Sequence, residues 1–438
     1  MSALAQYALK GGHFVSGSDL VSSPLIEELT ALGAKIAIGH DANNVKGAEM
    51  CIYSRAVKEN NPEYQECVKS NIKLLPREKM LSTIFNAAAD AIAVAGTHGK
   101  TTTCGLILSG LEKVGRSPTA FIGGVIEGRG NFISGGEDIV IAEACEYMGG
   151  FLTLIPKISV ILNVDLDHVD YYKQQIDLER AFTKFAANTR SNGALIVNGD
   201  AVPKYITRYA KCKVVTYGFN QSNHFYADNI RQIGGQYSFD CFLLGEYYAS
   251  LTLNIKGRHN IYNALAALLC ANVMSSDRAK SVEGIAGFNG AKRRWSLLDY
   301  PFTNVVEDYA HHPNEIRALI ETAKLQGYER ITAFFQPHTY TRTERFWNDF
   351  VSCFTGIDKL VLLPIYAARE APIEGITSQA LAKTISDAGL CDAEYCADFL
   401  SAVKIIERDC GKDDLVLIIG AGDINKLGDV LKERKDES

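Results

Sequence analysis

Residues 91–103 read Ala-Ile-Ala-Val-Ala-Gly-Thr-His-Gly-Lys-Thr-Thr-Thr. An apolar run of the kind that forms a buried strand turns through two glycines into Lys-Thr and continues as the helix-like stretch 104–114. This order is typical of a phosphate-binding loop, in which backbone N–H groups at the start of a helix face an anion. The sequence therefore predicts that the chain binds a nucleoside triphosphate.

Each residue type in the loop has a physical reason to be there. Gly96 and Gly99 would let the backbone approach a phosphate closely. Lys100 would reach the β- and γ-phosphates, and the Thr101 hydroxyl could bind Mg²⁺. The spacing is tighter than in the common pattern, because the two glycines are separated only by the pair Thr97-His98. An ordinary strand-to-helix turn is the alternative, but it does not explain why strand, glycines, Lys-Thr and helix occur in this order.

Size and composition indicate a large globular protein. A chain of 438 residues suits about three domains of roughly 150 residues each. The sequence is 47% apolar and 22% charged, and no apolar run reaches the ~20 residues of a membrane span. The first residues lack the basic start and cleavage site of a secretory signal, so we expect a cytoplasmic protein without a membrane partner.

Charge and cysteine usage exclude other classes. The formal charge is −6, and the one basic run, 292–294, is short, so nucleic acid is not expected as a partner. Eleven cysteines are scattered without a Cys-x-x-Cys pair. They are interpreted as reduced and mostly buried thiols, not as disulfides or zinc ligands.

Short apolar runs alternate with helix-like spans along the whole chain, which predicts an α/β protein. We expect three domains, at residues 1–84, 85–292 and 293–438, with a hinge over 287–294. The expected strands are 35–38, 50–53, 72–75, 139–142, 160–164, 304–306, 331–335, 359–363 and 415–419.

Polar side chains follow two strands near the phosphate loop. Glu143 and Glu146 follow the strand 139–142, and Asp-Leu-Asp-His168 follows the next strand. Ligands of open α/β sheets bind at the carboxyl ends of strands. Glu143 and His168 are therefore the leading candidates for holding Mg²⁺ against phosphate oxygens. For a single Glu or His taken alone, a solvated or capping role is an equal alternative.

Three further polar stretches lie later in the chain. Gly-Arg-His-Asn260 precedes a very apolar helix, where Asn260 alone could be an N-cap. Residues 307–313 and 335–343 each place histidine after a strand. These two loops suggest a second wall of one site.

Taken together, these stretches resemble the Mur ligases, the ATP-dependent amino-acid ligases of bacterial peptidoglycan synthesis. The resemblance rests on five segments in the family's order and covers nearly the whole chain. They are Ala-Gly-Thr-His-Gly-Lys-Thr-Thr-Thr (95–103), Asp-Leu-Asp-His (165–168), Gly-Arg-His-Asn (257–260), Asp-Tyr-Ala-His-His-Pro (308–313) and Phe-Gln-Pro-His-Thr-Tyr-Thr-Arg-Thr (335–343). The last two, with residues 365–373, are most similar to the members that attach the first amino acid, L-alanine, to UDP-N-acetylmuramate.

The resemblance implies a fold and a set of roles. It implies a Rossmann-like N-terminal domain for the UDP-sugar, a central ATPase domain with a mainly parallel sheet, and a C-terminal Rossmann-like α/β domain that closes over ATP and the amino acid. The implied ATP contacts are Gly96, Thr97, His98, Gly99, Lys100, Thr101, Thr102, Asn260, Asn263, Arg294, Asp308 and His311. The implied metal ligands are Thr101, Glu143 and His168, and the implied substrate contacts are Ser18, Asp19, Ser54, Gly123, Gly124 and Arg342.

The chain departs from the family pattern in three places. Many relatives carry Arg where this chain has Thr339, so binding of the amino-acid carboxylate would rest more on Arg342, and selectivity for alanine over glycine or serine stays open. The acidic stretch 143–147 has fewer Asp residues than in other members. The family also begins with a strand and a Gly-rich loop, whereas this chain opens at Met1-Ser2-Ala3. From that start, either a start placed too far downstream or a truncation, we expect weak binding of the UDP-sugar.

The expected reaction is an ATP-dependent amide synthesis through an acyl phosphate, with ATP and Mg²⁺ required. Lys100, His168 and His338 are the expected catalytic residues, and His168 and His338 remain alternatives for the proton acceptor. Two alternatives stay open: a ligase that recycles a whole tripeptide, and a non-catalytic nucleotide-binding relative. The chain is expected to be a monomer or a homodimer.

Overall fold

The phosphate-loop strand lies inside a ten-stranded sheet in the computed structural model, which describes residues 1–274 and 277–436. The strands of this sheet are β5 (Asp90–Ala95), β6 (Pro118–Ile126), β7 (Gly130–Ile133), β8 (Gly136–Ala144), β9 (Ile158–Ile161), β10 (Ala194–Asn198), β11 (Lys213–Gly218), β12 (Phe225–Ile233), β13 (Gln236–Leu243) and β14 (Glu246–Thr252). Their order is β14-β13-β12-β11-β10-β9-β5-β8-β6-β7. β5 pairs in parallel with β8 and β9, and antiparallel pairs occur only near the two ends of the sheet. The expected mainly parallel sheet is confirmed.

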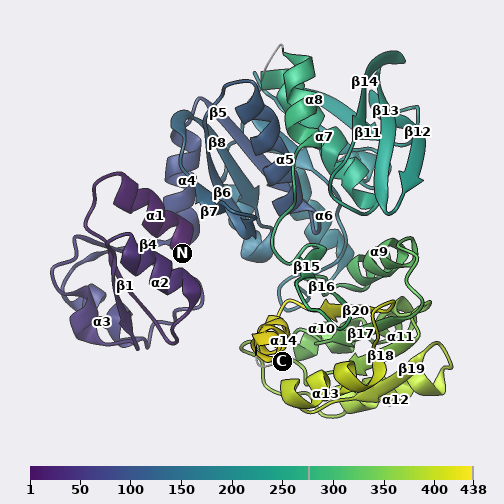
Figure 1. Ribbon diagram of the computed structural model, residues 1–438. Coiled ribbons are helices and arrows are strands. Elements are labelled where there is room, and N and C mark those ends of the chain that lie inside the picture. The colour runs from purple at the N-terminus through teal and green to yellow at the C-terminus, as the bar shows by residue number, and fades with distance from the viewer. Residues whose placement is uncertain (275–276, 437–438) are drawn as a thin grey trace.

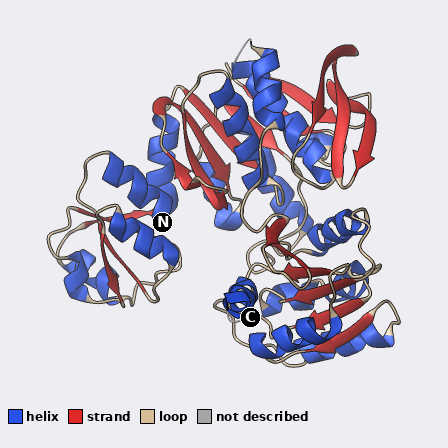
Figure 2. Ribbon diagram, viewed as in Figure 1, coloured by secondary structure: helices blue, strands red, loops and turns tan. Residues whose placement is uncertain are grey.

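Helices cover both faces of this sheet (Figure 2). The helices of the central unit are α5 (Lys100–Lys113), α6 (Gln175–Ala187), α7 (His259–Met274) and α8 (Arg278–Ala286), with the short 3-10 helices η2 (Tyr147–Thr153) and η3 (Lys204–Thr207). α5 and α7 bury Leu106 and Leu265 in one core, and α6 buries Phe182 and Phe185 in the other. A strand buried on both faces reads as a continuous apolar run, which is why the central strands were visible in the sequence.

The N-terminal unit contains two small parallel sheets (Figure 1). Its elements are α1 (Ser2–Lys10), β1 (Ser16–Asp19), α2 (Pro24–Ala31), β2 (Lys35–Ile38), η1 (Ala42–Val45), β3 (Met50–Tyr53), α3 (Pro62–Lys69), β4 (Lys73–Pro76) and α4 (Arg77–Ala87). β1 pairs with β2, and β3 pairs with β4. Side chains of Ser23 and Asn61 cap α2 and α3, and each helix begins with proline.

Helix α1 packs against the central sheet, which was not predicted. Tyr7 lies 5.7 Å from Phe121 and 6.2 Å from Phe132, measured between ring centroids. The side-chain amide of Asn131 donates to the Ser2 hydroxyl at 2.9 Å. These contacts join the start of the chain to β6 and β7.

The C-terminal unit is built on a six-stranded sheet of order β15-β16-β20-β17-β18-β19. Its elements are β15 (Ser296–Leu298), β16 (Asn304–Asp308), α9 (Pro313–Lys324), β17 (Ile331–Phe335), α10 (Tyr340–Arg345), α11 (Trp347–Cys353), β18 (Lys359–Leu362), α12 (Ser378–Asp387), β19 (Asp392–Tyr395), α13 (Phe399–Asp409), β20 (Leu415–Ile419) and α14 (Asn425–Asp436). All its pairs are parallel except β15 with β16. Figure 1 shows this unit below the central one.

The exact domain boundaries remain a proposal. We propose the ranges 1–84, 85–292 and 293–438 for the three units, although α4 runs through the first boundary. Residues 275–276 and 437–438 belong to these ranges and lie outside the described residues.

Two findings bear on the expectations from composition, in the part of the chain that the structure describes. None of its helices is long and apolar enough to cross a membrane. All eleven cysteines are free, and six of them are buried. Cys145 differs because it is exposed beside Glu146.

Candidate active site

The loop between β5 and α5 requires glycine at two positions. Gly96 has φ 148° and Gly99 has φ 83°, both in the region that favours glycine. A Cβ at Gly99 would lie 2.6 Å from Asn263 Oδ1, and one at Gly96 would lie 2.9 Å from Leu162 Cβ. The loop backbone is therefore held tightly between the strand end and helix α7.

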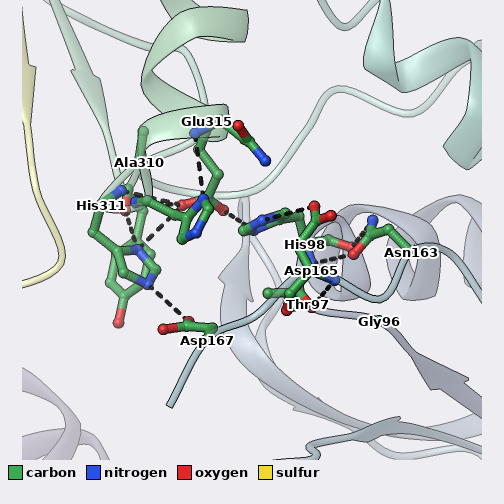
Figure 3. Close-up of polar contacts among 12 residues, drawn as sticks. Gly96, Thr97, His98, Asn163, Asp165, Asp167, Ala310, His311 and Glu315 are labelled. Carbon is green, nitrogen blue, oxygen red and sulfur yellow. Dashed lines mark hydrogen bonds and ion pairs between the residues drawn. The ribbon is translucent and has the colours of Figure 1, made fainter. Parts of the chain in front are cut away.

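The segment after β9 anchors the loop (Figure 3). The His98 N–H donates to Asn163 Oδ1 at 2.9 Å, and Asn163 Nδ2 donates to the His98 carbonyl at 3.2 Å. The Thr97 hydroxyl donates to the Asp165 carbonyl at 2.8 Å. The segment was expected to continue β9 to residue 164, but β9 ends at Ile161. Leu162 still donates to the Ala95 carbonyl of β5, and from Asn163 on the residues bind the loop.

Lys100 is held by a buried carboxylate. Its ammonium lies 3.0 Å from Glu146 Oε2 and also donates to the Gly96 and Thr97 carbonyls. Burial alone would lower the pKa of Lys100, but Glu146 outweighs burial and raises it. The lysine is therefore a cation at the mouth of the loop. In this structure Glu146 is the anion that it contacts, where a bound nucleotide would offer a phosphate.

Thr101 and Glu143 form an oxygen-rich pair beside the loop. The Thr101 hydroxyl donates to Glu143 Oε1 at 2.7 Å. A Cβ at Gly123 would lie 2.7 Å from Glu143 Oε2, and one at Gly124 would lie 2.8 Å from Thr101 Cγ2. The two glycines of β6 thus leave room beside both oxygens.

This pair fits a magnesium ion. Mg²⁺ in nucleotide sites binds one or two protein oxygens and completes its shell with phosphate oxygens and water. Within residues 1–274 and 277–436, no group of three or more His, Cys, Asp or Glu side chains forms a metal cluster. Thr101 and Glu143 could thus supply the one or two protein oxygens of such a site.

His168 contacts the same carboxylate, Glu146, that holds Lys100. Its Nε2 is 3.7 Å from Glu146 Oε1, and its ring centroid lies 4.8 Å from that of Tyr147, with the two rings tilted by 39°. Its backbone has φ 51°. The structure thus brings His168 to the Lys100–Glu146 pair, and its direct binding to a cation at Thr101 and Glu143 stays a prediction.

A cavity of about 390 Å³ opens beside the loop, between the central and C-terminal units. Among its lining residues are His98, Gly99, Thr102, Asn260, Asn263, Arg294, Trp295, Asp308 and Glu315. Asn263 Nδ2 donates to Asn260 Oδ1 at 2.8 Å, which orients the two amides. Most of the predicted ATP contacts from both units therefore meet at one cavity.

Asp308 holds part of the cavity wall that the C-terminal unit contributes. It ends β16 and accepts the N–H groups of Trp295 at 2.8 Å and Ala310 at 2.9 Å. Burial raises the pKa of Asp308. The carboxylate thus holds the turn that carries Trp295 into the cavity lining.

Glu315 connects the two units and was not predicted. Its Oε1 lies 3.1 Å from His98 Nδ1 and 3.6 Å from Arg294 Nη1. Its Oε2 lies 3.3 Å from His311 Nδ1 (Figure 3). The signal available in the sequence was a capping pattern, His312-Pro-Asn-Glu315 at the start of a helix, which indicates a cap but not a partner 217 positions earlier in the chain.

A second buried pair joins the same two units. Here the C-terminal unit supplies the cation, Arg342, and the central unit supplies the carboxylate, Asp167. Arg342 donates to Asp167 Oδ1 through Nη2 at 2.7 Å and through Nε at 3.0 Å. Arg342 Nη1 also donates to His338 Nδ1 at 3.0 Å. Burial alone would raise the pKa of Asp167, but Arg342 outweighs burial and lowers it.

The histidines of this junction are mostly neutral. Burial lowers the pKa of His311 to about 3, and burial with Arg342 lowers that of His338 to about 4. Burial with Arg294 lowers the pKa of His259 to about 4. His98 differs, because Glu315 outweighs burial and raises its pKa.

The candidates in the N-terminal unit lie at strand ends, apart from the loop. The Ser18 hydroxyl donates to Glu63 Oε2 at 2.7 Å, Asp19 is exposed at the end of β1, and Ser54 follows β3. A cavity of about 160 Å³ links this side to Glu143. Its lining includes Arg55, Arg77, Glu78, Glu143, Cys145 and Tyr147.

Family models match nearly the whole chain. The Mur ligase family catalytic domain matches residues 1–89, the Mur ligase middle domain matches residues 94–271, and the Mur ligase glutamate ligase domain matches residues 293–422.

Individual proteins agree with these models. The chain is 40% identical over 440 residues to UDP-N-acetylmuramate–L-alanine ligase of Caldanaerobacter subterraneus, covering 99% of this chain and 95% of that protein. It is 38% identical to the enzyme of that name from Clostridium perfringens, with 98% and 94% covered. The structure of UDP-N-acetylmuramate-alanine ligase from Thermotoga maritima superposes with a TM-score of 0.85 at 25% identity, over 100% of this chain and 96% of that one. A murein peptide ligase from Psychrobacter arcticus shares the fold, with a TM-score of 0.74 at 21% identity over 99% and 96% of the two chains. The chain belongs to the Mur ligase family.

Proposed function

We propose that this protein joins L-alanine to the lactyl carboxylate of UDP-N-acetylmuramate, with ATP converted to ADP and phosphate. The observation that carries the proposal is the full-length similarity to ligases of that name, together with an intact phosphate loop beside the 390 Å³ cavity. The reaction belongs to peptidoglycan synthesis.

The first step activates the carboxylate. A carboxylate does not acylate an amine at neutral pH because oxide is a poor leaving group, so its oxygen first attacks the γ-phosphorus and releases ADP. When the triphosphate binds, the Lys100 ammonium exchanges its contact with Glu146 for one with the phosphates. There it stabilises the charge on the phosphoryl group that is transferred. Thr101 and Glu143 would hold Mg²⁺, which neutralises phosphate charge when bound.

The nucleotide base is assigned to the large cavity. Asn260 and Asn263 present oriented amides there, and amides supply both the donors and the acceptors that an adenine edge requires. Arg294, Asp308 and His311 form the opposite wall or lie next to it, on the unit that closes over the nucleotide. Water exclusion by this unit protects the acyl phosphate from hydrolysis.

The second step is attack of the L-alanine amine on the acyl phosphate, with expulsion of phosphate. The amine must lose a proton, and the contacts of His338 argue against it as acceptor. Its Nδ1 already accepts from Arg342, which is always a donor, so in the neutral ring Nε2 carries the hydrogen. We therefore assign the proton acceptor to His168, beside Lys100 and Glu146.

Arg342 is assigned to the amino-acid site, but its guanidinium is already paired with Asp167 and is not a free partner for the substrate carboxylate. Its side chain is only 8% exposed, and two of its three nitrogens face Asp167. The carboxylate of L-alanine would meet a guanidinium that is already paired. Arg342 thus contributes positive charge and shape to this site, while Thr339 lacks the second guanidinium of many relatives.

The UDP-sugar is assigned to the N-terminal side. Ser18, Asp19 and Ser54 lie at strand ends, where Rossmann-like sheets bind nucleotides. The 160 Å³ cavity leads from this unit to Glu143, next to Gly123 and Gly124. A lactyl carboxylate entering there would approach the γ-phosphate from the side opposite the adenine cavity.

Phosphate release from ATP and Mg²⁺ tests the function. Release should require UDP-N-acetylmuramate and L-alanine together, and omission of either should leave only background. Glycine and L-serine replace L-alanine in parallel reactions to measure selectivity. Release with the tripeptide L-alanyl-γ-D-glutamyl-diaminopimelate but not with L-alanine would favour the recycling ligase, and nucleotide binding without any release would favour the non-catalytic relative.

A further inference from the structure

One side chain of the phosphate loop faces away from the loop's own anion site. The backbone of His98 is held by Asn163, whereas its ring reaches the C-terminal unit. There Nδ1 lies 3.1 Å from Glu315 Oε1, and the ring lies 4.9 Å from that of His312. A loop that only cradled phosphate through backbone N–H groups would not need this ring.

The two oxygens of Glu315 serve different partners. Oε2 accepts the backbone N–H groups of His311 at 3.1 Å and His312 at 3.3 Å, which closes the first turn of α9. Oε1 faces His98 and Arg294. Because a helix cap needs only the first set of contacts, the second set requires another explanation.

The contact between His98 and Glu315 is largely shielded from water. The side chains of His98 and Glu315 are 17% and 10% exposed, so little water competes for either. Glu315 raises the pKa of His98 against the effect of burial, while His98 and Arg294 lower the pKa of Glu315 well below its ordinary value. Each side chain has a second, longer contact, His98 Nε2 with Asp165 Oδ2 at 3.5 Å and Glu315 Oε1 with Arg294 at 3.6 Å. The 3.1 Å contact between them is the shorter one for both oxygen and ring, and losing a partner for a buried charge is costly.

We propose that Glu315 is a positioning residue of the ligase reaction, which fixes His98 and thereby the phosphate loop when the C-terminal unit lies over the nucleotide. The proposal rests on the proposed function, because it concerns the ATP half-site of that reaction. It joins two elements that both border the 390 Å³ cavity, the loop and the start of α9. Closure of the C-terminal unit would then also set the shape of the triphosphate site.

Glu315→Gln is the primary test variant. Its amide oxygen still accepts the N–H groups at the start of α9, but it has no charge to offer His98. We expect kcat/KM for ATP to fall about tenfold, the effect of losing about 1.4 kcal/mol. KM for UDP-N-acetylmuramate should not change, because that substrate is assigned to the far side of Glu143. Glu321→Gln, an exposed position in the same helix, is the matched control and should equal wild type.

A double-mutant cycle approaches the contact from the other side. His98→Ala should lose as much as Glu315→Gln, and the double variant should lose no more than either single one. His98→Asn, whose amide can replace the Nδ1–H donor, should lie closer to wild type than His98→Ala.

The outcomes separate the possible failures. Additive losses in the cycle, or a rise in KM for both ATP and the UDP-sugar with a lower Tm, would overturn the proposal and leave Glu315 as a helix cap. Binding of ADP, followed by the fluorescence of Trp295 in the cavity lining, gives the same comparison without turnover. If wild type binds ADP but makes no amide, the proposed function fails, while the coupling of His98 and Glu315 in ADP binding still supports or contradicts the positioning role.

Discussion

Around the phosphate loop, the central and C-terminal units meet through buried charges, whereas the N-terminal unit meets the central sheet through aromatic rings and partly exposed groups. The Glu315 carboxylate contacts His98 of the central unit, and the Asp167 carboxylate contacts Arg342 of the C-terminal unit. On the N-terminal side, Tyr7 packs on Phe121, and Arg55, 40% exposed, donates to the Met148 carbonyl at 3.3 Å.

The two junctions differ in how far the units could shift without losing the contacts between them. Buried ion pairs are favourable only in one arrangement, because a small displacement leaves a charge without a partner. Apolar packing is less directional and tolerates small shifts. The geometry of the ATP side is therefore more narrowly specified, and variants there should have larger effects than variants on the UDP-sugar side.

The largest effect should come from Lys100→Ala. The loop loses the cation that meets the transferred phosphoryl group, so phosphate release should fall by at least about a hundredfold. Lys113→Ala, at the exposed end of the same helix, is the control and should keep wild-type activity. An active Lys100→Ala protein would remove the phosphate loop from the mechanism.

Glu143→Gln should come next, with a fall of about a hundredfold at millimolar Mg²⁺. The amide keeps an oxygen beside Thr101 but loses the charge that attracts the ion. Part of the activity should return as Mg²⁺ is raised, which a titration of phosphate release against Mg²⁺ would reveal. Glu137→Gln, exposed at the other end of β8, should titrate like wild type. Equal Mg²⁺ dependence in all three proteins would contradict a metal role for Glu143.

Acid should weaken the charged junction at moderate pH. His259, His311 and His338 have pKa values lowered to about 4, 3 and 4, against about 6.5 in an unfolded chain. Their contribution to stability is complete above about pH 6.5 and is lost as the pH falls toward these lower values, because the unfolded state binds protons first. Tm measured by calorimetry should therefore be lower at pH 5 than at pH 7.5. A Tm that stayed level or rose at pH 5 would contradict neutral, buried histidines in the junction.

Asp167→Asn extends the same test to lower pH. The pKa of Asp167 is depressed in the folded protein, so its stabilisation is present above about pH 4 and is lost below it. The variant should be less stable than wild type at pH 7, and this difference should shrink as the pH falls through 4. Asp177→Asn, at an exposed position of α6, should show neither effect.

The smallest effect should come from Asp19→Asn on the other junction. If this exposed carboxylate binds the ribose of the UDP-sugar, KM for UDP-N-acetylmuramate should rise about fivefold, because the Asn amide still accepts a hydrogen bond and only about 1 kcal/mol is lost. KM for ATP should not change. Steady-state kinetics with each substrate varied in turn would show whether the two halves of the site respond separately.

Sequence patterns predicted the parts of the molecule in which chemistry and local order coincide. The continuous apolar runs 331–335 and 415–419 became β17 and β20 with the same bounds. The phosphate loop was visible because its glycines, lysine and threonine follow one another in a short stretch. Thr101 and Glu143 were expected to face one Mg²⁺, because Thr101 belongs to the phosphate loop and Glu143 follows a predicted strand of the same sheet.

Other parts depended on packing between distant segments. The antiparallel strands β12 to β14 alternate polar and apolar residues, a pattern that a search for continuous apolar runs does not detect. Packing of α1 on β6 and β7 depends on Tyr7 meeting Phe121, and nothing local to residues 2–10 indicates that partner. Glu315 and Asp167 likewise find their cations across the junction of two units, so their importance appeared only in three dimensions.

The most direct test of the account is to measure the product itself. Wild-type protein is incubated with ATP, Mg²⁺, UDP-N-acetylmuramate and L-alanine, and the nucleotides are analysed by mass spectrometry. The account predicts UDP-N-acetylmuramoyl-L-alanine in a one-to-one ratio with ADP. ADP formed without this amide, or neither product formed while ADP still binds, would contradict the assignment of the chain as this ligase.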